Sequence, residues 1–167
     1  MDIRFLDGCA YPEAVGPLFQ EYTDMLLSEN PAFSKYLQLQ HYAEELVHLE
    51  NKYGPPGGRL YLLETPVGEA VGTGALRRLD DEMCELKRLY IRPAFRGHGL
   101  AEETVRRLIT DARAMGYRRM VLDTFPFLKA AVRLYQKLGF GEIPSYNGAP
   151  MPDLIYLGLD LTSETDA

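Results

Sequence analysis

The sequence predicts an α/β fold in which about four helices flank one mixed, mostly antiparallel sheet. Two patterns predict this class. Three strand-like segments joined by turn residues fill residues 59–91, which is typical of an antiparallel meander. The order strand, helix, strand, helix, strand follows, and it requires at least one parallel crossover. Because the chain has 167 residues and is 46% hydrophobic, residues 1–161 can form one domain with a complete core.

The first sixty residues predict one strand and two helices. The segment "IRFL" alternates polar and apolar residues near the N-terminus. Apolar residues then recur at helical spacing from Pro12 to about Ser28, and Asn30-Pro31 ends that helix. A second helix is expected from about Ser34 to Tyr53, before the break "NKYGPPGG".

The same patterns predict the strands and helices of the rest of the chain. The meander consists of "RLYLLET", "EAVGTGALRRL" and "MCELKRLYI". A helix from residue 100 to Met115 ends at Gly116, "RRMVLDTF" is a strand, and residues 127–138 form another helix. The final strand, "DLIYLGLDL", is expected to offer an edge for pairing, so the protein is a monomer or a homodimer. Residues 162–167 are expected to form a disordered tail.

Composition excludes several classes of function. The chain contains no stretch of 18 uncharged apolar residues and begins like a strand, so we expect neither a membrane span nor a signal peptide. Cys9 and Cys84 lack a C-x-x-C partner, which favours reduced thiols and a cytoplasmic location. His41 and His48 match no metal motif, so no metal is expected. No basic surface rich in aromatic residues indicates nucleic acid as a partner.

Charge is distributed unevenly along the chain. The net charge is −6, yet residues 87–119 hold nine basic residues against three acidic ones. A basic segment inside an acidic protein indicates a local anionic ligand. The alternative is that some of these arginines simply form a solvated helix face.

The basic segment contains the junction "RLYIRPAFRGHGLAEETVRRL". Pro93 ends the strand, and Gly97 and Gly99 permit positive φ, so backbone N–H groups can converge on one anion at the helix start. Arg96 adds positive charge there, and the segment therefore predicts a phosphate or pyrophosphate site. A dinucleotide fingerprint would need glycine or alanine where Glu102 stands, and the G-K-[ST] of a Walker loop is absent.

Two motifs carry a resemblance to a known family. Arg96, Gly99 and Ala101 form R-x-x-G-x-A, and "AAVRLYQKLGF" follows one crossover later. Together, over residues 70–161, they resemble the GCN5-related N-acetyltransferases (GNAT). The resemblance implies a GNAT fold with a splayed parallel strand pair, acetyl-CoA as cosubstrate and an amine as acceptor. It also implies binding of acetyl-CoA by Leu89, Tyr90, Ile91, Arg96, Gly97, His98, Gly99, Leu100, Ala101, Ala131 and Lys137. Leu128 stands where the family often has an asparagine that contacts the cofactor.

The resemblance also implies catalytic roles. Tyr135 matches the family's tyrosine that protonates the departing thiolate, and it lies one helical turn after Ala131. Glu85 is the candidate base, since some members carry a glutamate there and it is expected to share a strand face with Lys87, Leu89 and Ile91. The alternatives are a packed core tyrosine and a carboxylate paired with a neighbouring cation. A covalent route through Cys84 is a further alternative.

The expected function is N-acetylation of a primary amine, most simply of a small molecule, by direct attack in a ternary complex. The alternatives are an acyl-CoA binding or sensor module without catalysis, and acetylation of protein amino groups. The first two helices and the loop over residues 142–153 are expected to form the acceptor pocket, with Tyr146 and Asn147 as candidate contacts. An excess of acids in residues 1–60 favours a cationic acceptor.

Overall fold

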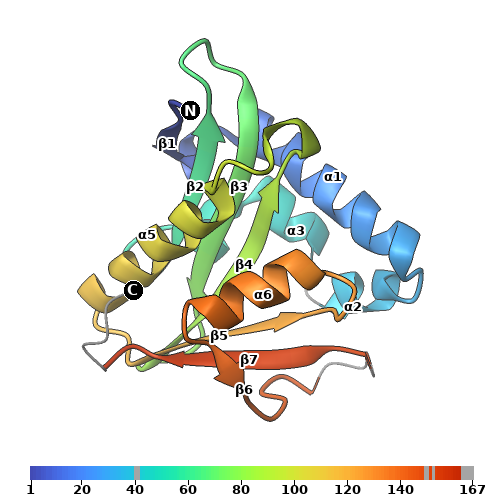
Figure 1. Cartoon of the computed structure of the whole chain (residues 1–167), viewed down its shortest axis with the longest axis vertical. Coiled ribbons are helices and arrows are strands. Elements are labelled where there is room, and N and C mark those ends of the chain that lie inside the picture. Colours follow the sequence, from blue (N-terminus) through green and yellow to red (C-terminus); the bar gives the residue numbers. More distant parts are fainter. Residues whose placement is uncertain (40–41, 149–150, 152, 163–167) are drawn as a thin grey trace.

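The computed structural model describes residues 1–39, 42–148, 151 and 153–162. They form a seven-stranded sheet in the order β1-β2-β3-β4-β5-β7-β6, with helices on both faces (Figure 1). Neighbouring strands are antiparallel except for β4 and β5, which are parallel. The predicted mixed α/β fold is therefore confirmed. The expected tail at residues 163–167 lies outside the described part of the chain.

The first 53 residues contain one strand and several helices. Their bounds are β1 Arg4–Asp7, the short 3-10 helix η1 Gly8–Ala10, α1 Pro12–Glu29, α2 Phe33–Leu39, α3 Tyr42–Val47 and α4 Leu49–Tyr53. The prediction of one long second helix is wrong, because three short helices occupy that region. Between α3 and α4, His48 has φ −131° and ψ 67°, which is not a helical conformation.

From Arg59 onward the elements follow the predicted order closely. The meander is β2 Arg59–Glu64, β3 Ala70–Arg78 and β4 Met83–Ile91, followed by η2 Pro93–Phe95, α5 Leu100–Ala114, β5 Arg119–Thr124, α6 Lys129–Lys137, β6 Gly141–Glu142 and β7 Ile155–Asp160. The expected edge at the final strand is not free along its length. The short strand β6 covers the middle of β7, pairing Gly141 with Gly158 and Glu142 with Leu157.

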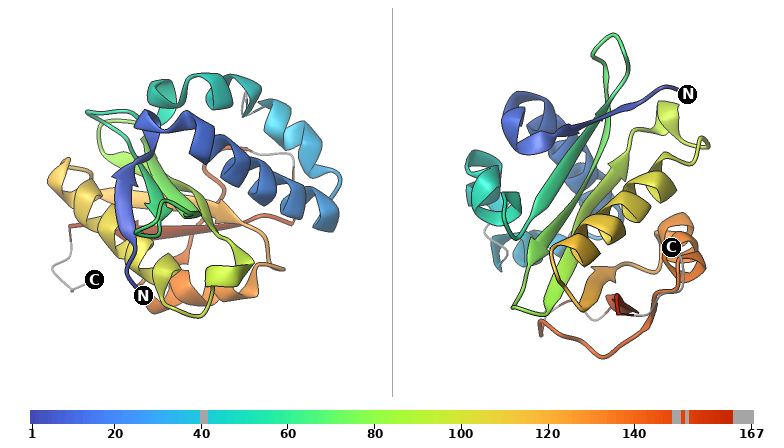
Figure 2. Two further views of the ribbon diagram at one scale, coloured as in Figure 1. Left: turned by 90° about the horizontal axis from the view of Figure 1, so that it is seen from above. Right: turned by 90° about the vertical axis from the view of Figure 1, so that its left-hand side faces the viewer.

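Helices cover the two faces of the sheet separately, α5 and α6 on one and α1, α3 and α4 on the other (Figure 2). One apolar core lies under α5 and α6, with Leu76, Val105, Leu108, Ile109 and Met120 among its members. A second lies under α1 and α4, with Val15, Leu18, Phe19, Tyr53 and Leu60. The close packing of α5 depends on Gly74 of β3, where a Cβ would lie 2.4 Å from Thr104 Cγ2.

The parallel pair β4 and β5 separates after a short paired stretch. Residues 83–85 of β4 pair with residues 119–121 of β5, and the register of the pair extends no further. Both strands nevertheless continue, β4 alongside β3 up to Ile91 and β5 alongside β7 up to Thr124. The two strands diverge in Figure 1, so the sheet is open in its middle.

No helix among the described residues is both long enough and apolar enough to cross a membrane.

Candidate active site

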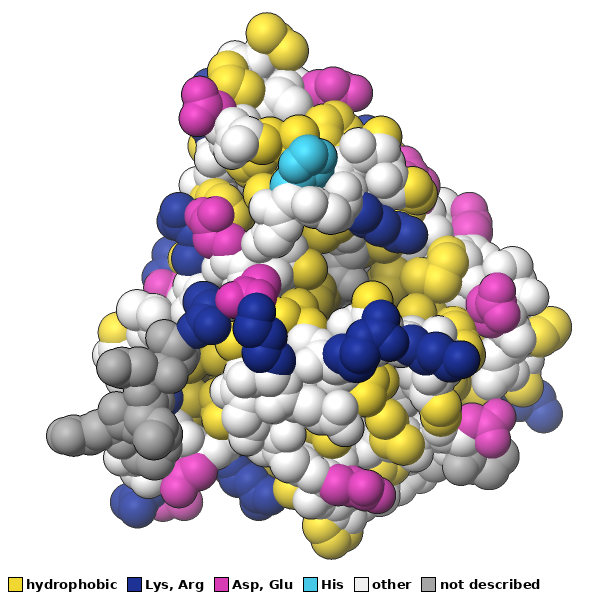
Figure 3. All heavy atoms as spheres, in the orientation of Figure 1, with side chains coloured by type: hydrophobic (Ala, Val, Ile, Leu, Met, Phe, Trp, Pro, Cys, Tyr) yellow, Lys and Arg dark blue, Asp and Glu magenta, His cyan; other side chains and the backbone are white. Residues whose placement is uncertain are grey.

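A cavity of about 620 Å³ occupies the opening between β4 and β5. Its wall includes Leu134 and Tyr135 of α6 on one face of the sheet, and Tyr22 and Met25 of α1 on the other. The cavity therefore continues through the sheet from one helical layer to the other. Figure 3 shows the hollow on the α5 and α6 side, with basic side chains along its rim.

The glycine loop lies at one end of this cavity. Gly97 and Gly99 have φ values of +83° and +74°, which confirms the predicted positive φ at both positions. Gly99 is the N-cap of α5, and the cavity wall contains Arg96, Gly97 and residues 99–102. The first N–H groups of a helix have no partner within the helix, and they carry the positive end of its dipole. This end of the cavity is suited to phosphate oxygens.

The contacts of Arg96 and one ion-pair network around Glu102 hold the loop and the start of α5 in place. Arg96 Nε donates to the Ile91 carbonyl oxygen at 2.9 Å, and its guanidinium lies 5.8 Å from the ring centroid of Tyr90. Lys137 Nζ and Arg106 Nε donate to the carboxylate of Glu102 at 2.7 and 3.1 Å. Bonds from these two cations lower the pKa of Glu102. Of the residues predicted to bind the cofactor, His98 and Lys137 lie outside the cavity wall, whereas Leu89, Tyr90, Ile91, Ala131 and the rest of the loop belong to it.

A β-bulge changes the faces of β4. Between the pairs Ala75–Lys87 and Thr73–Tyr90, β4 advances three residues while β3 advances two. Arg88 has φ +57°, and the Thr73 hydroxyl donates to its carbonyl oxygen at 2.8 Å. The expectation that Glu85 shares a face with Leu89 and Ile91 is wrong for this reason.

Lys87 and Arg88 consequently both lie on the α1 side of the sheet, whereas Leu89 packs under α5. One signal for the bulge was present in the sequence. Cys84 and Leu86 face the α5 core, so strict alternation would have placed the charged Arg88 in that core as well.

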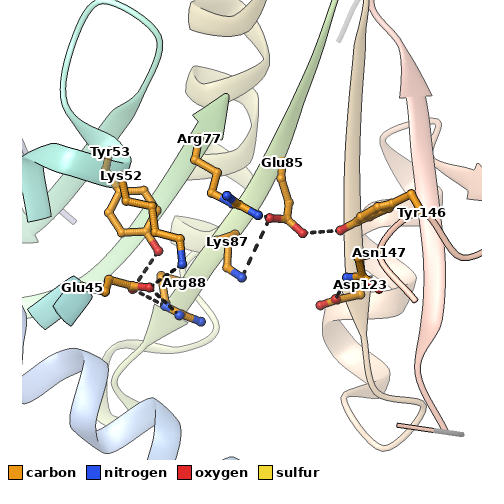
Figure 4. Close-up of polar contacts among 10 residues, drawn as sticks. All are labelled: Glu45, Lys52, Tyr53, Arg77, Glu85, Lys87, Arg88, Asp123, Tyr146 and Asn147. Atoms are coloured by element: carbon orange, nitrogen blue, oxygen red, sulfur yellow. Dashed lines mark hydrogen bonds and ion pairs between the residues drawn. The ribbon is translucent and has the colours of Figure 1, made fainter. Parts of the chain in front are cut away.

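Glu85 is a buried carboxylate with three polar neighbours (Figure 4). Arg77 Nε donates to it at 2.7 Å, the Tyr146 hydroxyl donates to its other oxygen, and Lys87 Nζ lies 3.8 Å away. Burial alone would raise the pKa of Glu85, but the charges of Lys87 and Arg77 outweigh burial and lower it. Glu85 is not part of the cavity wall, although Lys87 beside it is.

Arg88 connects the bulge to α3 through Glu45. The Arg88 Nε and Nη2 atoms donate to the two oxygens of Glu45 at 2.6 and 2.8 Å. Lys52 Nζ and the Tyr53 hydroxyl also donate to Glu45, at 2.8 and 2.7 Å. Burial works against the charged form, yet the bonds and charge of Arg88 and Lys52 lower the pKa of Glu45 to about 2. Local sequence patterns do not reveal this pair, because 43 residues separate its members.

Tyr135 lies on the cavity wall between α6 and the opening of the sheet. Its side chain is buried, and its ring lies 5.7 Å from that of Phe140. Burial raises the pKa of Tyr135 well above the usual range, and Tyr22 and Asp123 act in the same direction. The phenol therefore remains protonated at neutral pH and can serve as a proton donor.

Cys84 is poorly suited to covalent catalysis. It is fully buried in the core under α5 and does not contribute to the cavity wall. Burial raises the pKa of its thiol to about 12, so the nucleophilic thiolate is scarce at neutral pH.

The far end of the cavity is apolar. Aromatic side chains dominate it: the Phe33 and Phe125 rings meet edge to face with centroids 5.4 Å apart, and Phe127 stacks on Phe125 at 5.2 Å. Of the described residues up to position 60, the cavity wall takes Tyr22, Met25, Leu26 and Phe33, and none of the acids. The acidic excess of this segment therefore does not favour a cationic acceptor at this site.

The described histidines belong to no cluster that could hold a metal ion. Among the described residues, no group of three or more His, Cys, Asp and Glu side chains is arranged to hold a metal ion. His48 is exposed and lies 3.6 Å from Glu50, whereas His41 lies outside the described residues.

Comparison with known proteins connects this site to an enzyme family. The model of the acetyltransferase (GNAT) family matches residues 19–140. An uncharacterized N-acetyltransferase of Schizosaccharomyces pombe is 37% identical over 131 residues, which are 78% of this chain and 80% of that protein. The uncharacterized N-acetyltransferase YjgM of Escherichia coli is 40% identical over 101 residues, which are 59% of this chain and 60% of that protein. The structure of YncA from Salmonella typhimurium, solved with its cofactor acetyl-CoA, is 22% identical with a TM-score of 0.62, covering 100% of this chain and 97% of that one.

Proposed function

This chain belongs to the acetyltransferase (GNAT) family, and we propose that it transfers the acetyl group of acetyl-CoA to the primary amine of a small molecule. The observation that carries the proposal is the cavity that joins the glycine loop, through the opening of the sheet, to an apolar pocket under α1 and α2. One domain over residues 1–161, in the cytoplasm, would perform this reaction.

The chain's own residues suit the cosubstrate. The loop amides from Arg96 to Ala101 would bind the pyrophosphate, because both glycines leave the backbone uncovered and α5 begins there. The main chain of residues 89–91 borders the opening without a partner strand on that side, so its peptide groups can bond an extended ligand. Ala131 of α6 would border the same extended ligand. Leu128, in place of the family's frequent asparagine, offers only apolar contact.

Tyr135 is the proposed acid. Acetyl-CoA supplies the acetyl group as a thioester, whose carbonyl carbon forms a bond to the amine nitrogen while its bond to sulfur breaks. Tyr135 then donates its proton to the departing thiolate and regains one from solvent. A phenol held protonated by burial on the cavity wall supports this role. A backbone N–H of β4 near Ile91 is the proposed donor to the oxyanion.

Glu85 is the proposed base, and it would act without direct contact with the amine. Its carboxylate lies behind Lys87, whose ammonium borders the cavity. Because Glu85 lies outside the cavity wall, the proton released by the amine would reach its carboxylate through water, and Lys87 would keep its own protons. The lowered pKa of Glu85 makes this carboxylate a weak base, and the amine must therefore bind largely in its neutral form.

The cavity favours a small-molecule acceptor over a protein. Tyr22 and Leu26 of α1 and Phe33 of α2 cover the acceptor end, leaving an apolar pocket under the two helices. A lysine side chain of a folded protein would have to pass these helices to reach the opening.

Titration calorimetry with acetyl-CoA, followed by a thiol-release assay over a panel of amines, tests the proposal. The wild type should bind, and Gly99→Glu should lose binding, because its side chain brings negative charge to the anion site. Gly116→Glu is the matched control: that glycine also has positive φ, +91°, but it lies at the opposite end of α5. Binding without thiol release from any amine would indicate a binding module instead, and absence of binding would refute the proposal.

A further inference from the structure

Seven charged side chains around the bulge form a cluster whose positive and negative charges are unequal in number (Figure 4). We call it the bulge cluster, and its members are Glu45, Lys52, Arg77, Glu85, Lys87, Arg88 and Asp123. Four members are cations and three are carboxylates. It therefore holds one more positive charge than negative charge, on the acceptor side of the sheet.

The carboxylates of the bulge cluster are already bonded. Glu45 accepts from Arg88 and Lys52, and Glu85 accepts from Arg77 and Tyr146. Asp123, across the opening on β5, accepts from Asn147 Nδ2 at 2.9 Å. None of these bonds involves Lys87.

Lys87 carries the surplus charge. Its side chain is 5% exposed and borders the cavity, and within the described residues its ammonium makes no hydrogen bond. The Glu85 oxygen at 3.8 Å is too distant for one. Taking an ammonium out of water is costly unless it is paired and hydrogen-bonded, so this position favours an anionic partner from the ligand.

The protonation of Lys87 agrees with this geometry. Burial lowers its pKa to about 8, with Arg88 and Lys52 acting in the same direction and Glu85 and Asp123 opposing them. An anion bound within hydrogen-bond distance would restore the charged form.

The surroundings of Lys87 restrict the kind of anion. One surplus charge matches a monoanion, and the pocket beyond it is lined by apolar groups such as Met25, Phe33 and Phe125. We infer that the acceptor carries a carboxylate beside its amine, as amino acids with an apolar side chain do, and that Lys87 binds this carboxylate. The inference rests on the proposed function and adds the substrate class to it.

Product analogues test the inference without turnover. Protein saturated with CoA is titrated with the N-acetyl derivatives of glycine, L-methionine and L-phenylalanine, each as the free acid and as the carboxamide. We expect at least one acid to bind about tenfold or more tightly than its amide. Lys87→Gln should remove this preference and Lys87→Arg should retain most of it. Lys129→Gln is the control, because Lys129 also borders the cavity but is exposed, and it should leave the preference unchanged.

Equal affinity for acid and amide in all three pairs, including no detectable binding of either, would overturn the inference. So would an acid preference that persists in Lys87→Gln. Binding of CoA itself is measured first in the wild type and each variant, which confirms that the variants fold. If the wild type does not bind CoA, the proposed function is refuted. This outcome is distinct from a failure to prefer the acid over the amide.

Discussion

Burial fixes the protonation of the side chains that matter most at this site. It raises the pKa values of Tyr135 and Cys84, so both remain protonated near neutral pH. The consequences differ, because Tyr135 borders the cavity while Cys84 faces the core. The pKa of Glu45 is lowered instead, since two cations outweigh the effect of burial and keep its carboxylate ionised.

Tyr135→Phe should lower kcat by about 100-fold or more, the scale of general acid catalysis. Acetyl-CoA affinity should change little, because the ring still fills its place beside Phe140. Tyr117→Phe is the matched control: Tyr117 donates to the Gly57 carbonyl oxygen at 2.6 Å, away from the cavity, and kcat should be retained. Steady-state thiol release measures both variants. Full turnover by Tyr135→Phe would leave the tyrosine as a packing residue only.

Glu45 should make stability sensitive to acid. Its pKa falls from 4.5 to about 2 on folding, so its contribution is complete above pH 4.5 and is lost as the pH falls toward 2. The contribution is on the order of 3 kcal/mol. Glu45→Gln should therefore be less stable than the wild type at pH 7, with a difference that shrinks as the pH approaches 2. Denaturant unfolding at several pH values measures this difference. The exposed Glu29→Gln is the control and should differ little at any pH; a constant deficit for Glu45→Gln would argue against ionisation as the cause.

At the scale of elements, the structure shows what local sequence patterns can convey. β4 has the predicted bounds, Met83–Ile91, because its flanking turns are encoded locally. Its bulge was not predicted, since alternation was assumed to run unbroken through Arg88. Three helices occupy the region in which a single helix up to Tyr53 was expected. The break was not predicted, because the helical spacing of apolar residues continues in register across a non-helical residue such as His48.

The packing of α5 on β3 depends on Gly74. Gly74→Ala should destabilise the protein by about 1 to 3 kcal/mol, the usual cost of overpacking, because the new methyl group would meet Thr104. Gly16→Ala in α1 meets nothing within 4 Å and should instead stabilise by about 0.5 to 1 kcal/mol, since alanine favours helix. Thermal and denaturant unfolding compare the two variants. A neutral Gly74→Ala would mean that α5 can shift away from the sheet.

At the scale of the whole molecule, the cavity wall at the glycine loop was predictable from the sequence and the opposite end of the cavity was not. Arg96 to Ala101 and Ala131 to Tyr135 lie in two short segments whose backbone and spacing are readable from the sequence. That opposite end combines Phe33, Lys87 and Phe125, which come together only through tertiary packing. The contacts of Tyr146 with Glu85 and of Asn147 with Asp123 likewise span 61 and 24 residues. Such placements depend on the whole fold.

The initial-velocity pattern with acetyl-CoA and an accepted amine tests the central claim most directly. The cavity passes through the sheet, and none of the described cysteines belongs to its wall, so the amine should attack while acetyl-CoA is still bound. Double-reciprocal plots at several fixed amine concentrations should then intersect, as they do for a ternary complex. Parallel lines, together with an acetyl group retained on the protein before amine is added, would contradict direct attack and indicate a covalent acetyl-enzyme.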